Sequence, residues 1–209
     1  MKGRFITIEG GDGAGKTTHM NRIHQWLIDQ GHEVVLTREP GGTRSGEQIR
    51  EILLHTKGVL SSESELLLMF AARQQNIQEV ILPSIAAGKC VLCDRFTDAS
   101  YAYQGGGGGI PRSRIAQLEQ WVQGGLQPDL TIVLDVPVEM GIARTAERAQ
   151  GDSQSDRFES TSSEYKAAVR NVYLDRCRQF PDRMKRVDST GSIEEVGEII
   201  EALLVAHFQ

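Results

Sequence analysis

The sequence that decides the fold is Gly10-Gly11-Asp12-Gly13-Ala14-Gly15-Lys16-Thr17, which directly follows an apolar run at residues 4–9. It matches the pattern G-x-x-x-x-G-K-[ST], and a helical pattern with Ile23, Trp26 and Leu27 on one face comes after it. A strand, a glycine-rich loop and a helix in this order build a phosphate-binding loop. Glycines allow successive backbone N–H groups to point into one concavity at the helix N-terminus.

Each residue type in this loop has an expected part. The loop backbone would surround the phosphate oxygens, Lys16 would meet the β- and γ-phosphate charge, and the Thr17 hydroxyl would reach Mg²⁺. The alternative is a glycine-rich turn with a chance lysine, but the order of elements favours the phosphate-binding interpretation. We therefore expect an ATP site with Mg²⁺, formed by residues Gly10, Gly11, Asp12, Gly13, Ala14, Gly15, Lys16 and Thr17.

The rest of the chain predicts an α/β fold. Five short runs rich in Val, Ile and Leu alternate with helical patterns, at residues 4–9, 33–37, 89–93, 130–135 and 184–187. Runs that are apolar on both faces and separated by helices indicate a five-stranded parallel sheet with helices on both faces. The length of 209 residues suits one domain, residues 1–209. Within it, the polar segment 149–163 is either a disordered loop or a mobile lid.

Composition excludes several classes of protein. The net charge of -5 argues against a broad nucleic-acid footprint. The first apolar run is interrupted by Glu9 and is too short for a signal peptide or a membrane span, so we expect a cytoplasmic protein with no membrane partner. Cys90 and Cys93 form a C-x-x-C, but their apolar surroundings favour buried strand cysteines over a redox pair.

The class of phosphate-loop protein follows from what comes after the strands. None of the three asparagines is followed by Lys, so the N-K-x-D guanine signature of a GTPase switch is missing. One apolar run reaches Asp94-Arg95 and another reaches Asp135-Val136, and neither Asp is followed by the Glu usual in motor ATPases. An Asp-Arg pair offers a magnesium-side carboxylate and an anion clamp, which suits phosphoryl transfer to a second phosphate. We expect Asp135 to be a loop or helix-start residue.

A second group of residues could recognise a base. Phe70 and Arg73 are three apart on a helix, so a ring would lie beside a forked donor, although Phe70 alone also suits the core. Ser100, Tyr103 and Gln104 have the i, i+3, i+4 spacing of one helical face. The Gln104 amide can donate and accept at once, as a pyrimidine edge requires. Tyr103 could instead pack under the following glycine run without contacting any ligand.

From end to end, the sequence resembles the bacterial thymidylate kinases in an ordered series of blocks. The blocks lie at residues 10–17, 37–43, 68–73, 94–98, 101–107, 128–131 and 156–159. The resemblance implies a P-loop kinase fold and transfer of the γ-phosphoryl group of ATP to dTMP, with Mg²⁺, in a homodimer. A kinase for another nucleoside monophosphate is the nearest alternative, and a non-enzymatic nucleotide switch is a more distant one.

The resemblance also implies roles on the nucleoside side. Phe70 would stack on thymine, while Arg73 and Gln104 would contact its edge. Tyr103 would fill the space that a ribose 2′-hydroxyl needs. Asp12 would reach the deoxyribose 3′-hydroxyl, at a position where many bacterial relatives carry Glu.

The phosphates would be held by arginines. The resemblance implies that Arg38 and Arg95 bind the acceptor phosphate. The resemblance also implies that a member whose phosphate-binding loop lacks an arginine, as residues 10–17 do here, supplies one from the lid, and Arg148 and Arg157 are the candidates. Asp94 would act through Mg²⁺ or its waters. This sequence has Gly108 where relatives commonly carry Arg.

Overall fold

The computed structural model describes residues 3–56, 58–149, 158 and 161–208. Its five strands form one parallel sheet in the order β2-β3-β1-β4-β5. The strands are β1 (Arg4–Gly10), β2 (Val34–Arg38), β3 (Cys90–Asp94), β4 (Leu130–Asp135) and β5 (Met184–Asp188). Every predicted apolar run is therefore a strand, and the predicted ends differ from the observed ends by at most one residue.

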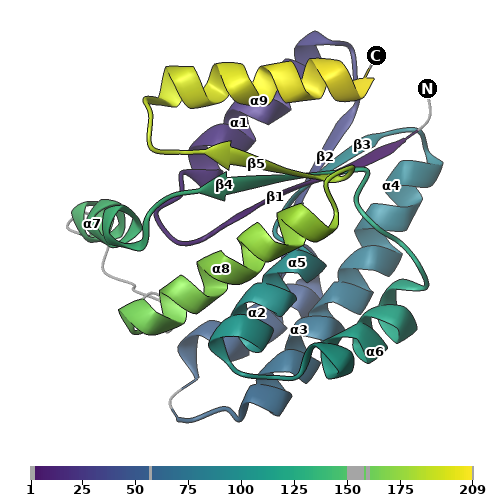
Figure 1. The fold of residues 1–209 in the computed structure, drawn as a ribbon. Helices are drawn as coiled ribbons and strands as arrows, with labels where there is room; N and C mark the ends of the chain where they lie inside the picture. The colour runs from purple at the N-terminus through teal and green to yellow at the C-terminus, as the bar shows by residue number, and fades with distance from the viewer. Residues whose placement is uncertain (1–2, 57, 150–157, 159–160, 209) are drawn as a thin grey trace.

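Helices cover both faces of the sheet, as predicted (Figure 1). Helices α1 and α9 lie on one face, and α3, α4, α5, α6 and α8 lie on the other, with α2 packed against α3 (Figure 1). The described helices are α1 (Lys16–Asp29), α2 (Arg44–His55), α3 (Ser62–Asn76), α4 (Leu82–Ala86), α5 (Thr97–Ser100), α6 (Arg112–Gln123), α7 (Val138–Ala149), α8 (Ser163–Gln179) and α9 (Ile193–Phe208), with the π-helical segments η1 (Ile77–Ile81) and η2 (Tyr101–Gly107). Across the described residues, no helix is both long and apolar enough to span a bilayer.

Successive side chains along β1 point to alternate faces of the sheet, so the core has two layers. Ile6 and Ile8 point to the α1 side, where they pack with Ile23, Leu27 and Ile200, all fully or almost fully buried. Burying one such side chain contributes about 1.5–3 kcal/mol, so this layer fixes α1 and α9 to the sheet. Because α1 begins at Lys16, the same packing fixes the loop that precedes it.

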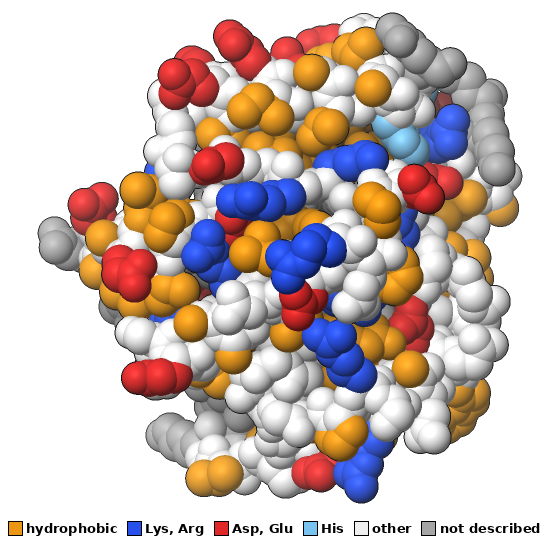
Figure 2. All heavy atoms as spheres, viewed as in Figure 1, with side chains coloured by type: hydrophobic (Ala, Val, Ile, Leu, Met, Phe, Trp, Pro, Cys, Tyr) orange, Lys and Arg blue, Asp and Glu red, His pale blue; other side chains and the backbone are white. Residues whose placement is uncertain are grey.

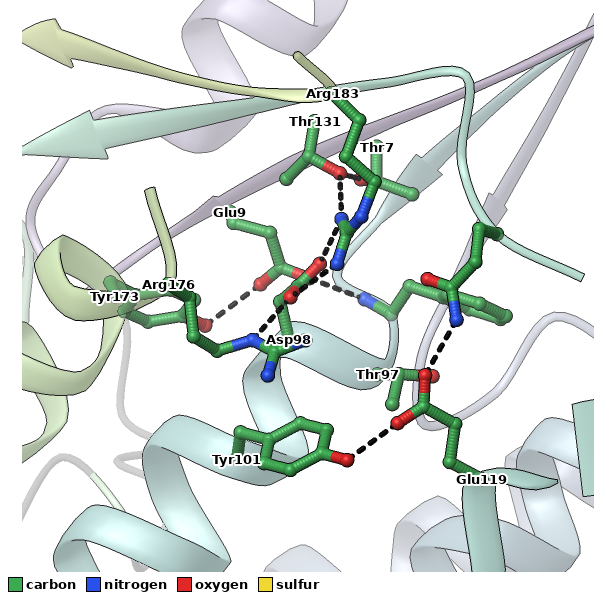
Figure 3. Close-up of polar contacts among 12 residues, drawn as sticks. Thr7, Glu9, Thr97, Asp98, Tyr101, Glu119, Thr131, Tyr173, Arg176 and Arg183 are labelled. Carbon is green, nitrogen blue, oxygen red and sulfur yellow. Dashed lines mark hydrogen bonds and ion pairs between the residues drawn. The ribbon is translucent and has the colours of Figure 1, made fainter. Parts of the chain in front are cut away.

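The opposite face of β1 carries polar groups into the interior (Figure 3). Thr7 and Thr131 face each other on β1 and β4, with their hydroxyl oxygens 2.8 Å apart. Beside them, the Asp98 carboxylate accepts hydrogen bonds from Arg176 at 2.5 Å and from Arg183 at 2.8 Å. Asp98 is fully buried, so this trio ties α5 to α8 and to the turn before β5 through charges that water does not screen.

The two cysteines of β3 are buried and free, which confirms their assignment as strand residues. Burial raises the pKa of the Cys93 thiol well above its ordinary value. A thiol with a raised pKa is a poor nucleophile.

Charge is distributed unevenly on the surface. Although the net charge is -5, Lys and Arg side chains gather across the middle of the face in Figure 2, over the region that α8 and β5 occupy in Figure 1. Some of these cations pair with buried acids: Arg170 and Arg186 both bind the Asp135 carboxylate.

We expect Asp98→Ala to lower the free energy of unfolding by about 3–5 kcal/mol, because it leaves the buried guanidinium of Arg176 and the partly buried one of Arg183 without their carboxylate. Urea unfolding followed by circular dichroism measures the loss. The control is Glu63→Ala, which breaks an exposed pair with Arg114 and should cost at most about 1 kcal/mol. Equal losses in the two variants would contradict this account of the trio.

Candidate active site

The phosphate-binding loop connects β1 to α1 at the carboxyl end of the sheet. Gly13 and Gly15 have φ angles of 73° and 89°, in the region that favours glycine. A Cβ atom at Gly13 would overlap the backbone carbonyl of Gly141 in α7, so this position also requires close contact between two chain segments. Helix α1 then begins at Lys16, and its free N–H groups face the concavity of the loop.

Lys16 lies across this loop. Its Nζ atom donates hydrogen bonds to the carbonyl oxygens of Gly10 and Gly11, at 3.1 and 2.9 Å. Burial, and then the charge of Arg95, lower the pKa of the amino group to about 8, against the opposing effect of Asp94 and Asp12. The ammonium form therefore predominates at pH 7, which places a partly buried cation beside the loop.

Arg95 follows β3 in an unusual backbone conformation. Its φ angle is 69°, and among the described residues it is the one non-glycine residue with a positive φ. This conformation costs about 1–2 kcal/mol, so surrounding contacts must hold it. The guanidinium donates to the Gly10 carbonyl at 2.9 Å, lies 3.3 Å from the Asp12 carboxylate and stacks 4.8 Å from the centre of the Tyr103 ring.

Asp12 is the acidic member of this group. Although burial opposes ionisation, the charges of Arg95 and Lys16 hold the pKa of its carboxyl below the ordinary value. The Tyr103 hydroxyl lies 3.4 Å from the same carboxylate. The loop therefore presents one carboxylate, already ionised, next to two cations and a phenol.

Several clefts open beside the loop. Gly11, Asp12 and Tyr103 line one of them with residues of α7 and α8, and two others, the first and second clefts, contain further predicted residues. The first is lined by Asp12, Arg73, Arg95, Ser100, Tyr103 and Gln104, together with Glu39, Pro40, Arg50 and Phe158. The second is lined by Thr17, Arg38 and Asp94, together with Thr37, Gly42 and Glu47. The structure thus brings six predicted residues together in one cleft, but it places Arg38 in the other.

Arg73 forms the floor of the first cleft. It is 2% exposed and donates to the Glu39 carboxylate at 2.7 Å, the Ser100 hydroxyl at 3.1 Å and the Phe96 carbonyl at 3.1 Å. Its guanidinium carbon is 4.5 Å from the centre of the Phe70 ring, so the predicted ring and donor do lie side by side. Phe70 itself is 1% exposed and packs in the core, and its contact with a base stays a prediction.

The other wall of the cleft is η2, which contains Tyr103 and Gln104. The sequence predicts that Ser100, Tyr103 and Gln104 share one face of an α-helix. The segment after Ser100 is π-helical instead, but all three side chains line the first cleft. The Gln104 amide donates to Glu65 at 2.8 Å. The Tyr103 ring packs edge-on against Phe158, with ring centres 5.8 Å apart.

The second cleft contains a carboxylate without a partner. Asp94 Oδ1 is buried and has no hydrogen-bond partner among the described residues, although Asp94 shares this cleft with Thr17. Carboxylate and hydroxyl oxygens are ligands that Mg²⁺ prefers, and the ion usually completes its shell with water and substrate phosphates. The residues present therefore fit a magnesium ion. Arg38, at the mouth of the cleft, pairs with Glu47 at 2.8 Å.

Three sequence predictions need comment. The expectation that Asp135 is a loop or helix-start residue is wrong: it ends β4, is buried and pairs with Arg170 and Arg186. Arg148 lies in the last turn of α7, and its side chain is not among those described. Arg157 and most of the predicted lid at 149–163 lie outside the described residues.

Sequence reasoning missed two residues beneath the site. Glu9 is the one acidic residue of the apolar strand β1, and Tyr173 lies on α8, far away in sequence. The Tyr173 hydroxyl donates to the Glu9 carboxyl at 2.7 Å, and its oxygen lies 3.4 Å from the Arg95 guanidinium. The interruption of an apolar strand by Glu9 was a usable signal, whereas nothing in the sequence marks Tyr173.

Comparison with known proteins agrees with this geometry. The family model described as thymidylate kinase matches residues 8–200. A thymidylate kinase of Neisseria gonorrhoeae is 50% identical over 208 residues, covering 100% of this chain and 99% of its own. One of Pseudomonas putida is 51% identical over 205 residues, covering 98% and 96%.

A solved structure is also similar. The crystal structure of thymidylate kinase from Ehrlichia chaffeensis has a TM-score of 0.79 and 34% sequence identity, and the match covers 97% of this chain and 100% of that one. Both the sequence match and the fold extend over nearly the whole chain. The chain therefore belongs to the thymidylate kinase family.

Proposed function

We propose that the chain transfers the γ-phosphoryl group of ATP to dTMP, giving ADP and dTDP. The observation that carries this proposal is the first cleft. Asp12 of the phosphate-binding loop and the neighbouring Arg95 line it together with the buried guanidinium of Arg73 and the amide of Gln104. A donor nucleotide at the loop and an acceptor nucleotide in this cleft would meet with their phosphates beside Arg95. Membership of the family supports the choice of nucleotides.

The reaction needs positioning and neutralisation rather than a general base. The acceptor is a phosphate monoester whose second pKa is about 6, so it is largely a dianion at neutral pH. The main barrier is the alignment and repulsion of two polyanions. Lys16 would neutralise the donor side and Arg95 the acceptor phosphate, and both are partly buried, where their charge is screened less than on the open surface.

Thr17 and Asp94 would hold Mg²⁺, and the unpartnered Oδ1 of Asp94 supports this assignment. The ion, when bound, supplies charge neutralisation at the phosphate oxygens. Arg38 faces the same cleft, so it would approach the acceptor phosphate from the side opposite Arg95. Its present partner Glu47 is partly exposed, and an exposed pair of this kind is weak enough to exchange for a phosphate.

The nucleoside would be read in the first cleft. Arg73 and Gln104 would contact the edge of thymine, Phe70 would lie against its face and Tyr103 would exclude a 2′-hydroxyl. Asp12 would accept the hydrogen bond of the 3′-hydroxyl, which suits its ionised state. Ser100, hydrogen-bonded to Arg73, would hold that guanidinium in place.

Four broader expectations remain proposals. We propose that residues 1–209 form a single kinase domain with a lid at 149–163, because all five strands share one sheet and the family model spans most of the chain. A lid arginine, Arg148 or Arg157, would reach the transferred group. The resemblance to bacterial relatives supports a homodimer and a cytoplasmic location.

A panel of acceptors tests the function. ATP and Mg²⁺ would be supplied with dTMP, dUMP, UMP, CMP or AMP, and formation of ADP would be followed. We expect the highest kcat/KM with dTMP. A higher value for another monophosphate would make the chain a kinase for that nucleotide, and slow hydrolysis with no acceptor would indicate a nucleotide switch.

We expect Arg73→Ala to raise KM for dTMP by roughly 10- to 150-fold, because a hydrogen bond to a charged group is worth about 1.5–3 kcal/mol. Gln104→Ala should raise it by roughly 2- to 12-fold, because a hydrogen bond between neutral groups is worth about 0.5–1.5 kcal/mol. KM for ATP should change far less. Steady-state kinetics with each substrate varied in turn measures both values. Gln25→Ala, which alters an exposed glutamine on α1, is the control, and a selective loss of ATP affinity would show that the two nucleotide sites are exchanged.

Lys16→Ala should show the opposite pattern. We expect kcat to fall by at least ~10²-fold, because a preorganised charge on the transferring phosphoryl group is lost. The affinity for dTMP should remain, because Lys16 does not line the first cleft. Single-turnover rates and dTMP titration by calorimetry separate the two effects, and a near-normal kcat would remove Lys16 from the mechanism.

Tyr103→Ala should narrow the preference for dTMP over ribothymidine monophosphate by roughly 10-fold or more, because an unsatisfied hydroxyl pressed against a fixed ring costs about 1–3 kcal/mol. The ratio of kcat/KM for the two acceptors measures this preference. Tyr103→Phe keeps the ring and should keep the ratio. An unchanged ratio in an active Tyr103→Ala enzyme would assign the discrimination to another residue.

A further inference from the structure

Glu9 is a buried acid that the proposed reaction does not use. It lies near the carboxyl end of β1 and is 0% exposed. Its side chain is on the face of the sheet that carries Thr7, directed toward α5 and α8 (Figure 3). Burying a carboxyl group is costly unless its oxygens are hydrogen-bonded, so the contacts of Glu9 indicate why it is there.

Both carboxyl oxygens contact the surroundings of Arg95. Oε1 accepts the backbone N–H of Phe96 at 2.7 Å, and Phe96 directly follows the left-handed residue Arg95. Oε2 accepts the hydroxyl of Tyr173 at 2.7 Å. The Tyr173 oxygen in turn lies 3.4 Å from Nη1 of Arg95. One side chain is therefore connected to the backbone after Arg95 and, through a phenol, to the guanidinium.

The backbone of this turn depends on such a contact. The N–H of Arg95 donates to the carbonyl of Ile8 at 3.0 Å, so the first half of the turn is attached to β1 by the main chain. The next N–H, that of Phe96, is buried and has the Glu9 carboxyl as its acceptor. Without Glu9 this N–H would be left unsatisfied, and the left-handed conformation would lose the bond that closes the turn.

We propose that Glu9 is a positioning residue that holds Arg95 in its left-handed conformation and, through Tyr173, aims the guanidinium at the acceptor phosphate. This inference rests on the proposed function, in which Arg95 binds that phosphate. Glu9 touches neither nucleotide in this scheme, and its whole effect on turnover passes through Arg95.

The environment makes Glu9 a neutral acceptor. Burial, reinforced by the charge of Asp98, raises the pKa of the carboxyl to about 8, although Arg95, Tyr173 and the Phe96 N–H oppose the shift. Lys16 is a further cation close enough to interact with it. The carboxyl is therefore mostly protonated at pH 7, with one oxygen a carbonyl acceptor and the other a hydroxyl. A glutamine amide can keep the acceptor oxygen for the Phe96 N–H, and its NH₂ group can donate to the Tyr173 oxygen.

The test compares four variants in the full-length enzyme. Glu9→Ala should lower kcat/KM for dTMP by ~10- to 100-fold, since misplacing a positioned group by about 1 Å has an effect of this size, while KM for ATP should change by less than about 3-fold. Tyr173→Phe should produce a smaller loss in the same parameter. Glu9→Gln should restore most of the activity that Glu9→Ala loses.

Thr7→Val is the control for lost stability. This substitution on the same strand removes the buried hydrogen bond between Thr7 and Thr131, which does not involve the Arg95 turn.

A double-mutant cycle with Arg95→Ala isolates the coupling. If Glu9 acts only through Arg95, then Glu9→Ala should cause no further loss of kcat/KM in an enzyme that already lacks the Arg95 side chain. If the loss of kcat/KM in the double variant equals the product of the losses in the two single variants, the inference is overturned. A Glu9→Gln enzyme as impaired as Glu9→Ala would overturn it as well. An Arg95→Ala enzyme with normal kcat/KM would refute the proposed role of Arg95 itself, whereas impaired Arg95→Ala with unimpaired Glu9→Ala would refute the inference alone.

Discussion

The left-handed turn at Arg95 is the constraint on which the geometry of the site depends. The turn follows Asp94, the last residue of β3, which lines the second cleft with Thr17. It directs the next side chain, that of Arg95, into the first cleft with Arg73. Because β1 and β3 are neighbours in a parallel sheet, with Ile8 beside Asp94, the turn also lies directly next to the phosphate-binding loop.

The charges around this turn are assembled in advance of any substrate. Lys16, Arg95 and Asp12 are partly buried, and they contact backbone carbonyls, one another and the phenols of Tyr103 and Tyr173. Incoming phosphates would therefore meet cations that are already in place. A preorganised group of this kind needs little rearrangement during the reaction, which is the usual source of electrostatic catalysis.

Much of this arrangement could be predicted from the sequence, because its signals are local. Strand and helix patterns predicted the five strands, and motifs and their spacing pointed to six of the residues that line the first cleft. What could not be predicted arises from contacts between distant segments. Arg38 and Arg95 were both expected to bind the acceptor phosphate, which stays a prediction, and no sequence signal indicated that Arg38 would pair with Glu47 and line the second cleft. Asp135 was expected in a loop or at the start of a helix, but it is the last residue of β4, where Arg170 on α8 and Arg186 on β5 pair with its buried carboxylate. Tyr173 contributes through a packing contact that no sequence interval encodes.

The glycines of η2 have a consequence for the helix that follows the predicted lid. A Cβ atom at Gly106 would approach Val172 to 2.7 Å, and the Tyr165 hydroxyl donates to the backbone carbonyl of Tyr103 at 3.1 Å. The side chains of Val172 and Tyr165 on α8 therefore pack directly on the glycine backbone of η2. A tilt of α8 would press on the backbone that carries Tyr103 and Gln104. A bulkier residue at Gly106 or Gly107 would have to displace α8, and it would shift this wall of the first cleft with it.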